Sequence, residues 1–87
     1  MSYTVRYEPE ALESLANLPL NIQDRIVKKL DWLAENFDKI NPLGLTGDLA
    51  EFYKLRVGDY RIIYELSDTG DEIIIVKLGH RRDIYNR

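Results

Sequence analysis

The sequence predicts an α+β fold in which two N-terminal helices pack on one face of a mostly antiparallel four-stranded sheet. Two observations lead to this prediction. A segment with helical periodicity, residues 22–37, is followed by three segments with the two-residue period of strands, which short turns separate. One further alternating segment precedes the helices, so the expected order is β-α-α-β-β-β. Strands joined by short turns pair antiparallel, which makes most of the sheet antiparallel.

The first part of the chain contains one strand and two helices. A strand is expected over residues 2–7, where aromatic and aliphatic residues alternate with polar ones. Pro9 suits the first turn of a helix over about 10–17, and Asn21 is placed to cap the start of the next helix. That second helix is amphipathic, because its apolar residues recur three or four positions apart, at Ile22, Ile26, Leu30, Leu33 and Phe37.

The second part of the chain supplies the other strands. Residues 38–50 are rich in turn-forming residues and are expected to form a connector rather than a linker between domains. Three strands follow, over residues 51–57, 60–66 and 72–78. The Gly58-Asp59 pair between the first two resembles the tight Gly-X turn of a β-hairpin. In strict alternation, one face of the last strand carries Ile74, Val76 and Leu78, with His80 in phase.

The composition limits what the chain can be. Its 87 residues, of which 45% are hydrophobic and 31% charged, are typical of one small globular domain, expected to span residues 1–87. The absence of cysteine excludes a disulfide framework, and a single histidine cannot assemble a usual zinc site. No apolar run approaches the roughly 20 residues that span a bilayer, and the start lacks a signal peptide's apolar region. A cytoplasmic protein without membrane association, metal or cofactor is therefore expected.

The charge is unevenly distributed, although the formal net charge of −3 does not by itself favour a nucleic acid partner. Residues 1–52 carry five Lys/Arg against nine Asp/Glu, whereas residues 53–87 carry seven against six. Since side chains alternate across a strand and the helices cover only one face, basic residues of three strands are expected to share the open face. They are Lys54, Arg56, Arg61 and Lys77. Such a face suits phosphate, while the alternative is that these are ordinary solvated strand charges.

Four segments of the sequence resemble the RelE/ParE superfamily of toxins from type II toxin–antitoxin systems. They are YEPEAL at 7–12, LTGDL at 45–49, FYKLRVGDYRIIY at 52–64 and GHRRDIY at 79–85. The resemblance covers nearly the whole chain and implies two helices against an antiparallel sheet. It also implies a RelB-like antitoxin that binds the toxin in a hetero-oligomer, with operator DNA contacted only through the antitoxin. RelE-like members cleave mRNA in the ribosomal A site, whereas ParE-like relatives act on DNA gyrase.

The resemblance further implies which residues form the site. RelE-type enzymes carry basic residues on the strand after the connector, an arginine on the next strand, and an arginine and a tyrosine near the end. The matching positions, taken as catalytic candidates, are Lys54, Arg56, Arg61, Arg81 and Tyr85. RNA binding is expected to involve Lys54, Arg56, Lys77 and Arg82.

These residue types suit RNA cleavage through the ribose 2′-hydroxyl, which must lose a proton as it attacks the phosphate. Negative charge then builds around the phosphorus, and fixed cations such as Arg61 and Arg81 stabilise it. Arg56 replaces the second lysine of the RelE pattern and stays protonated. This favours Lys54 as the base, since neighbouring positive charge favours a lysine's neutral form. Tyr85 is a candidate for stacking on a base or orienting the attacking sugar.

His80 is a secondary candidate, because an imidazole transfers protons readily near neutral pH. If the last strand continues in phase, however, His80 shares a face with Leu78, away from Lys77 and Arg81, which favours a structural role. Two other functions stay open. One is a ParE-like toxin that inhibits gyrase without nuclease activity. The other is a degenerate toxin that acts only in a regulatory complex with antitoxin and operator DNA.

Overall fold

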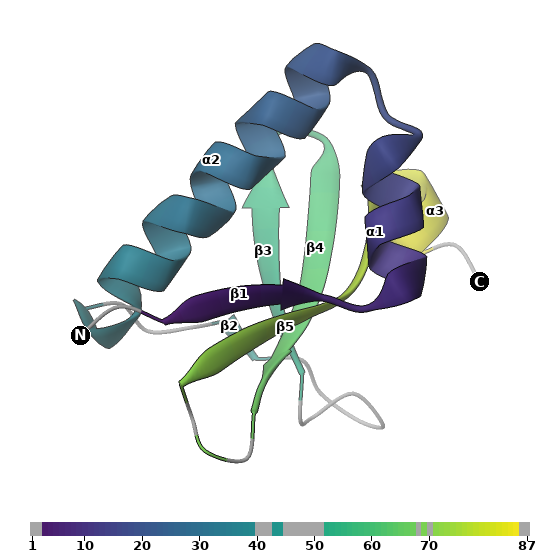
Figure 1. The fold of residues 1–87 in the computed structure, drawn as a ribbon. Coiled ribbons are helices and arrows are strands. Elements are labelled where there is room, and N and C mark those ends of the chain that lie inside the picture. Colours follow the sequence, from purple (N-terminus) through teal and green to yellow (C-terminus); the bar gives the residue numbers. More distant parts are fainter. Residues whose placement is uncertain (1–2, 40–42, 45–51, 68, 70, 86–87) are drawn as a thin grey trace.

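Helices and strands occur in the order that the sequence predicts, which confirms the α+β fold class. The structure is a computed structural model that describes residues 3–39, 43–44, 52–67, 69 and 71–85 (Figure 1). Its strands are β1 (Thr4–Tyr7), β2 (Leu43–Gly44), β3 (Tyr53–Val57), β4 (Tyr60–Leu66) and β5 (Glu72–His80). Its helices are α1 (Pro9–Ala16), α2 (Leu20–Asn36), the short 3₁₀-helix η1 (Phe37–Lys39) and α3 (Arg81–Tyr85). The short β2 and the C-terminal α3 are additions to the predicted order.

The five strands form one sheet in the order β1-β5-β4-β3-β2. The pairs β2–β3, β3–β4 and β4–β5 are antiparallel, whereas β1 pairs parallel with β5. The parallel pair follows from the chain path, because α1 and α2 lie between β1 and the later strands and provide the crossover that parallel pairing needs. β5 therefore lies inside the sheet, between the first strand of the chain and β4 (Figure 1).

The helices α1 and α2 supply the apolar cover of the sheet. Pro9 occupies the first turn of α1, where its missing N–H needs no partner. α2 begins at Leu20, so the expectation that Asn21 caps it is wrong. Pro19 stands at the N-cap position, and its carbonyl accepts the N–H of Gln23 at 2.9 Å. The apolar residues of α2 that recur with the predicted period face the sheet, and those fully buried are Ile26, Leu30 and Leu33.

The core lies between these helices and one face of the sheet. Tyr64 belongs to this core, and Tyr7 and Tyr60 pack against it. Tyr64 is 1% exposed; the Tyr53 ring stacks on it at a centroid distance of 5.6 Å, and Phe37 meets it edge-on. Full burial of one large apolar side chain contributes about 1.5–3 kcal/mol to the free energy of unfolding. The sheet side of this core consists of Ile62, Tyr64, Ile73, Ile75 and Leu78.

A β-bulge in β5 changes which residues of this strand face the core. One residue, Val76, is skipped in the pairing with β4. The bulge shifts the alternation by one position, so that the core face of β5 carries Ile73, Ile75 and Leu78. The expectation that Ile74 and Val76 share a face with Leu78 is therefore wrong. Lys77 keeps its predicted place on the face opposite the helices, where its cross-strand partner is Ile63 of β4.

The hairpin between β3 and β4 has the tight Gly-X turn that the sequence predicts. Gly58 has a φ of +58°, while Asp59, like every described residue other than glycine, has a negative φ. A positive φ at the first central position alone is typical of a type II′ turn, whose twist matches that of the paired strands. Arg25 approaches this turn from α2, and its Nη2 lies 3.1 Å from the point where a Cβ on Gly58 would lie. The positive φ favours glycine here, whereas Arg25 Nη2 is the end of a flexible side chain that can shift.

Most of the connector predicted over residues 38–50 lies outside the described residues. The structure describes residues 38–39 at the end of η1 and the two residues of β2, which pair with β3 through Leu43–Lys54 and Gly44–Tyr53. None of the helices in the described ranges is long and apolar enough to cross a membrane.

Candidate functional site

Basic side chains of three strands lie on the face of the sheet opposite the helices. Arg56 of β3 stands directly opposite Arg61 of β4. Lys54 is the partner of Ile63, which on its other side pairs with Lys77 of β5. Because these residues alternate with core residues along their strands, their side chains point away from α1 and α2. We refer to this surface, defined by Lys54, Arg56, Arg61 and Lys77, as the basic face.

The Arg56–Arg61 pair is electrostatically unfavourable by itself, because like charges directly opposed on neighbouring strands destabilise a sheet. Among the described residues, no carboxylate lies within ion-pairing distance of either guanidinium. A salt bridge between described residues joins Lys28 to Asp24 at 3.0 Å, but it lies on the exposed side of α2, away from both arginines. Arg56 is exposed and Arg61 is half-buried, so an anion from solution can reach both. The pair is suited to receiving negative charge.

Arg61 is held in place by the β3–β4 turn. Its Nη1 donates to the carbonyl oxygen of Gly58 at 2.9 Å and to that of Tyr60 at 3.1 Å. The Nε and Nη2 groups make no hydrogen bond to any residue that the structure describes. A guanidinium uses such a remaining pair of donors to bind two oxygens of one anion. The conformation of Gly58 thus helps to place an arginine of the basic face.

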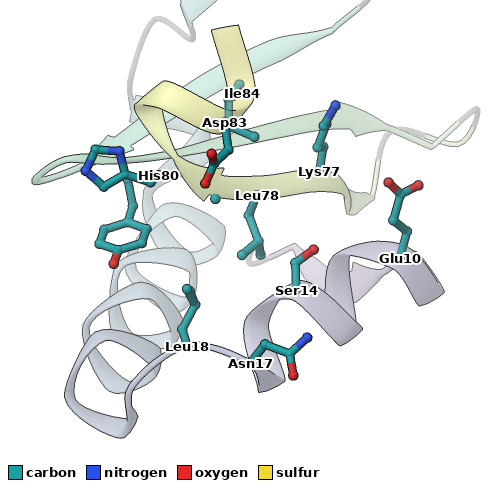
Figure 2. A pocket seen from close by; sticks show the side chains of 11 residues that line it. Glu10, Ser14, Asn17, Leu18, Lys77, Leu78, His80, Asp83 and Ile84 are labelled. Atoms are coloured by element: carbon teal, nitrogen blue, oxygen red, sulfur yellow. The ribbon is translucent and has the colours of Figure 1, made fainter. Parts of the chain in front are cut away.

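The two lysines of the basic face are half-buried. Lys54 lies between Leu43 of β2 and Ile63 of β4, so strand pairing fixes its backbone on both sides. Lys77 follows the bulge of β5, and Figure 2 shows its side chain extending away from α1. Both ammonium groups therefore share the open side of the sheet with the arginine pair.

Arg81 and Arg82 belong to α3 and not to the last strand. β5 ends at His80, so the expectation that Arg81 continues the strand in phase with Lys77 is wrong. The N–H of Arg81 donates to the carbonyl oxygen of Asp59 at 2.8 Å, which attaches the start of α3 to the β3–β4 turn. Both arginine side chains are exposed. Arg61 and Arg81 are thus tied to adjacent residues of one turn, although they lie far apart in the sequence.

The rest of α3 is fixed by packing. Ile84 is 9% exposed, and its Cδ1 lies 3.6 Å from the point where a Cβ on Gly79 would lie. Tyr85 is the last residue of α3, but its side chain lies outside what the structure describes. The helix therefore carries Arg81, Arg82 and Tyr85 together beside the end of β5.

His80 lies where β5 meets α3. Its Nδ1 accepts the N–H of Arg82 at 3.2 Å, and its ring contacts the Tyr60 ring edge-on at a centroid distance of 5.6 Å. The ring borders a pocket that also contains Glu10 of α1 and Asp83 of α3 (Figure 2). This pocket opens beside α1 and is also lined by Lys77 at the edge of the basic face, whereas Arg56 and Arg61 do not line it. His80 is therefore separated from the arginine pair by the sheet itself.

The groups with shifted pKa values lie away from the basic face. Burial, and after it the charge of Asp31, raises the pKa of Tyr7. Burial is also the main cause that raises the pKa of Tyr64 to about 12. A hydrogen bond from the Thr69 hydroxyl lowers the pKa of the Asp71 carboxyl, which is on the surface. No group of three or more histidine or carboxylate residues within the described ranges is arranged to hold a metal ion.

Arg25 is a basic neighbour of the site that sequence reasoning missed. In the sequence it is one more charged residue on the solvent side of an amphipathic helix. In the structure its guanidinium lies against Gly58, the residue whose carbonyl oxygen accepts from Arg61. Only the packing of α2 across the β3–β4 turn brings these residues together, so no spacing in the sequence could have indicated it.

Comparison with known proteins gives consistent matches over the chain. The family model described as ParE toxin of type II toxin-antitoxin system, parDE, matches residues 5–85. Toxin RelG of Mycobacterium tuberculosis is 34% identical over 89 residues, which cover 100% of both chains. A ParE family model and a Rel-type relative therefore match the same residues.

Solved structures agree with these matches. A chain of the toxin-antitoxin complex RelBE2 from Mycobacterium tuberculosis is similar with a TM-score of 0.81 and 28% identity, over 93% of each chain. A chain of the archaeal RelE-RelB complex from Pyrococcus horikoshii OT3 is similar with a TM-score of 0.71 and 31% identity, over 93% of this chain and 97% of that one. The likeness extends to nearly the full length of both relatives.

Proposed function

Because the chain belongs to the RelE/ParE superfamily of type II toxins, we propose that it is a metal-independent endoribonuclease that cleaves mRNA in the ribosomal A site. The proposal treats the chain as one toxin domain that acts in the cytoplasm. It assigns the chemistry to the basic face together with α3, and it needs no cofactor.

The opposed Arg56 and Arg61 carry this proposal. Two arginines that stand directly opposite each other on neighbouring strands, with no described carboxylate beside them, repel each other in the free protein. An RNA phosphate between them replaces that repulsion by charge-assisted hydrogen bonds, which are stronger than neutral ones. A sheet surface that served only solvation would gain stability from any neutral residue at either position. The arrangement therefore favours a polyanionic ligand.

The proposed reaction takes place at one phosphate. The 2′-hydroxyl loses its proton while its oxygen bonds to phosphorus. The bond from phosphorus to the 5′-oxygen breaks, and this oxygen takes a proton from water, which leaves a 2′,3′-cyclic phosphate and a 5′-hydroxyl. Lys54 is assigned the proton removal, since it is the lysine next to the arginine pair on β3. Arg56, Arg61 and Arg81 stabilise the charge that builds on the phosphate oxygens. Tyr85 is assigned stacking on a base.

The remaining basic residues are assigned to binding. Lys77 and Arg82, together with Lys54 and Arg56, would contact phosphates of the neighbouring nucleotides. Such contacts position RNA without reading its bases. Codon choice would then depend on the ribosome and on stacking rather than on these cations.

The test compares wild type with the Arg61→Ala, Arg81→Ala double variant, each induced without antitoxin, while new mRNA 5′ ends are mapped during translation. Removal of one charge-stabilising group typically lowers the rate by about 10²–10³, so the codon-phased cuts of wild type should vanish in the variant. Lys28→Ala, Lys29→Ala is the matched control, because both lysines lie on α2, away from the basic face. Its cuts should persist.

The match to a ParE family model favours a second candidate, a toxin that inhibits DNA gyrase without nuclease activity. Growth arrest without new RNA ends, together with loss of supercoiling activity in purified gyrase, would support it. A chain whose induction causes neither effect would instead be a degenerate toxin that acts only in a regulatory complex.

A RelB-like antitoxin is the proposed protein partner, in a toxin–antitoxin hetero-oligomer. The solved relatives include complexes named RelBE2 and RelE-RelB. An acidic segment that folds on binding would neutralise the basic face and compete with RNA for it. Operator DNA would be reached only through the antitoxin.

A further inference from the structure

We propose that His80 is a positioning residue that fixes the N-terminus of α3 and so holds Arg81 and Arg82 at the β3–β4 turn. The consequence for cleavage rests on the proposed function, whereas the anchoring of α3 does not. His80 itself touches neither RNA nor the reacting atoms in this assignment.

The need for an anchor follows from the length of α3. The helix has five residues, Arg81–Tyr85, and helices this short do not form in water without tertiary contacts. Its first turn also has N–H groups that no helical carbonyl can accept. Two of them have acceptors outside the helix: the Asp59 carbonyl accepts from Arg81 at 2.8 Å and His80 Nδ1 accepts from Arg82 at 3.2 Å. The imidazole thus does the work of an N-cap side chain.

The His80 ring is itself fixed from the side of β4. His80 pairs with Tyr60 across the strands, and the two rings meet edge-on at an interplanar angle of 75°. Acceptance from the Arg82 N–H requires that Nδ1 carry no proton, which places the proton of the neutral ring on Nε2. The ring is therefore held both by its edge-on contact with Tyr60 and by the helix that it caps.

The position of the ring argues against a direct chemical role. His80 faces the pocket beside α1, with Glu10, Asp83 and Tyr60 among the residues that line it (Figure 2). Lys77 also lines this pocket, but Arg56 and Arg61 do not. Arg61 pairs with Gly79, so its side chain lies on the face of the sheet opposite His80. A base that served the 2′-hydroxyl would have to lie on the same side as these cations. What His80 can supply to that side is the position of α3.

The experiment uses two amide variants of the full chain. The Asn side chain places its oxygen where His80 Nδ1 lies and is a strong N-cap, so His80→Asn should keep the anchor. The Gln side chain places its amide near the Nε2 position instead, so His80→Gln is the matched loss variant. The readouts are hydrogen exchange at the Arg81 and Arg82 amides, and mRNA cleavage in cell-free translation. Far-UV circular dichroism checks that both variants fold.

We expect His80→Gln to increase exchange at the Arg82 amide by about tenfold and to slow cleavage by a similar factor. His80→Asn should match wild type in both readouts. The proposal is overturned if His80→Asn keeps the Arg82 amide protected but loses cleavage, because the imidazole would then act chemically. It is also overturned if the Arg82 amide is unprotected in wild type. If wild type does not cleave mRNA, the proposed function fails, and the exchange readout alone still decides whether His80 anchors α3.

Discussion

Arg56 and Arg61 are like-charged residues at directly opposed positions of β3 and β4, so stability and activity should respond in opposite directions to one substitution. Arg56→Gln removes the repulsion and keeps a polar side chain on β3. We expect the free energy of unfolding to rise by a few tenths to about 1 kcal/mol, while RNA cleavage falls. Urea unfolding and 5′-end mapping measure the two quantities.

Arg6→Gln is the matched control for this prediction. Arg6 is also an exposed arginine on a strand, but its neighbour in the pairing, Ile74, carries no charge. Its effect on stability should stay within about 0.5 kcal/mol. A clear loss of stability in Arg56→Gln would contradict the idea that Arg56 is strained by Arg61.

Tyr64 links stability to pH at the alkaline end. Burial, and after it the nearby Tyr53 hydroxyl, raises the pKa of Tyr64 from 10.0 to about 12. The folded protein therefore holds the phenol proton more tightly than the unfolded chain does. This contribution to stability is complete below about pH 10 and is lost as the pH rises towards about 12. Once fully lost, it amounts to about 2–3 kcal/mol.

Tyr64→Phe should remove this sensitivity, because phenylalanine has no proton to lose. Urea unfolding at about pH 8 and about pH 11.5 would measure the free energy of unfolding of both proteins. Wild type should lose more stability between the two conditions than the variant. Equal losses would show that deprotonation of Tyr64 is not coupled to unfolding.

Among the elements, the β3–β4 turn has the most specific demand on its sequence. Gly58→Ala forces an alanine into a φ of +58° and brings its Cβ to 3.1 Å from Arg25 Nη2. We expect a loss of about 1–2 kcal/mol in the free energy of unfolding. Because the turn also accepts hydrogen bonds from Arg61 and the Arg81 N–H, cleavage should fall as well.

Gly79→Ala is the matched control for the turn. Gly79 has no positive φ, and a Cβ there would meet Ile84 Cδ1 at 3.6 Å, an ordinary contact. Its effect on the free energy of unfolding should be less than about 0.5 kcal/mol. Equal losses in the two variants, measured by urea unfolding, would mean that the strained φ of Gly58 is not what matters.

Periodicity predicted those elements that their own residues determine. The strand over 60–66 and the helix over about 10–17 agree with β4 and α1 to within a residue. The bulge at Val76 was not predictable, because it depends on how β5 pairs with β4 and not on β5 alone. The same holds for β2 and α3, whose few residues owe their conformation to tertiary contacts.

The candidate site was predictable to a similar extent. Strand alternation placed Arg56, Arg61 and Lys77 on one face. The prediction holds for Lys77 because the bulge at Val76 precedes it, so that Lys77 and Leu78 still lie on opposite faces. The position of Arg81 was not predictable, since it depends on where β5 ends and on the carbonyl of Asp59. The prediction that His80 shares a face with Leu78 agrees with the strand pairing, but the hydrogen bond that its Nδ1 accepts from the Arg82 N–H depends on α3 and was not predictable.

For the whole molecule, a net charge of −3 coexists with one cationic surface, so RNA binding should depend strongly on salt. Each phosphate contact with a single strand adds about 0.7 to the slope of log K against log salt. Lys77→Gln should reduce the slope by about this amount, whereas Lys28→Gln on α2 should leave it unchanged. Fluorescence anisotropy with a short single-stranded RNA measures both. Equal slopes for all three proteins would contradict a phosphate contact at Lys77.

The place of β5 inside the sheet also bears on how the protein is made. Synthesis delivers β1, both long helices and the β3–β4 hairpin before β5, yet β5 is the strand that joins β1 to β4. Contacts between segments so distant in sequence form late, because loop closure costs entropy before it is rewarded. A nascent chain therefore cannot complete its sheet, or attach α3 to it, until β5 has left the ribosome.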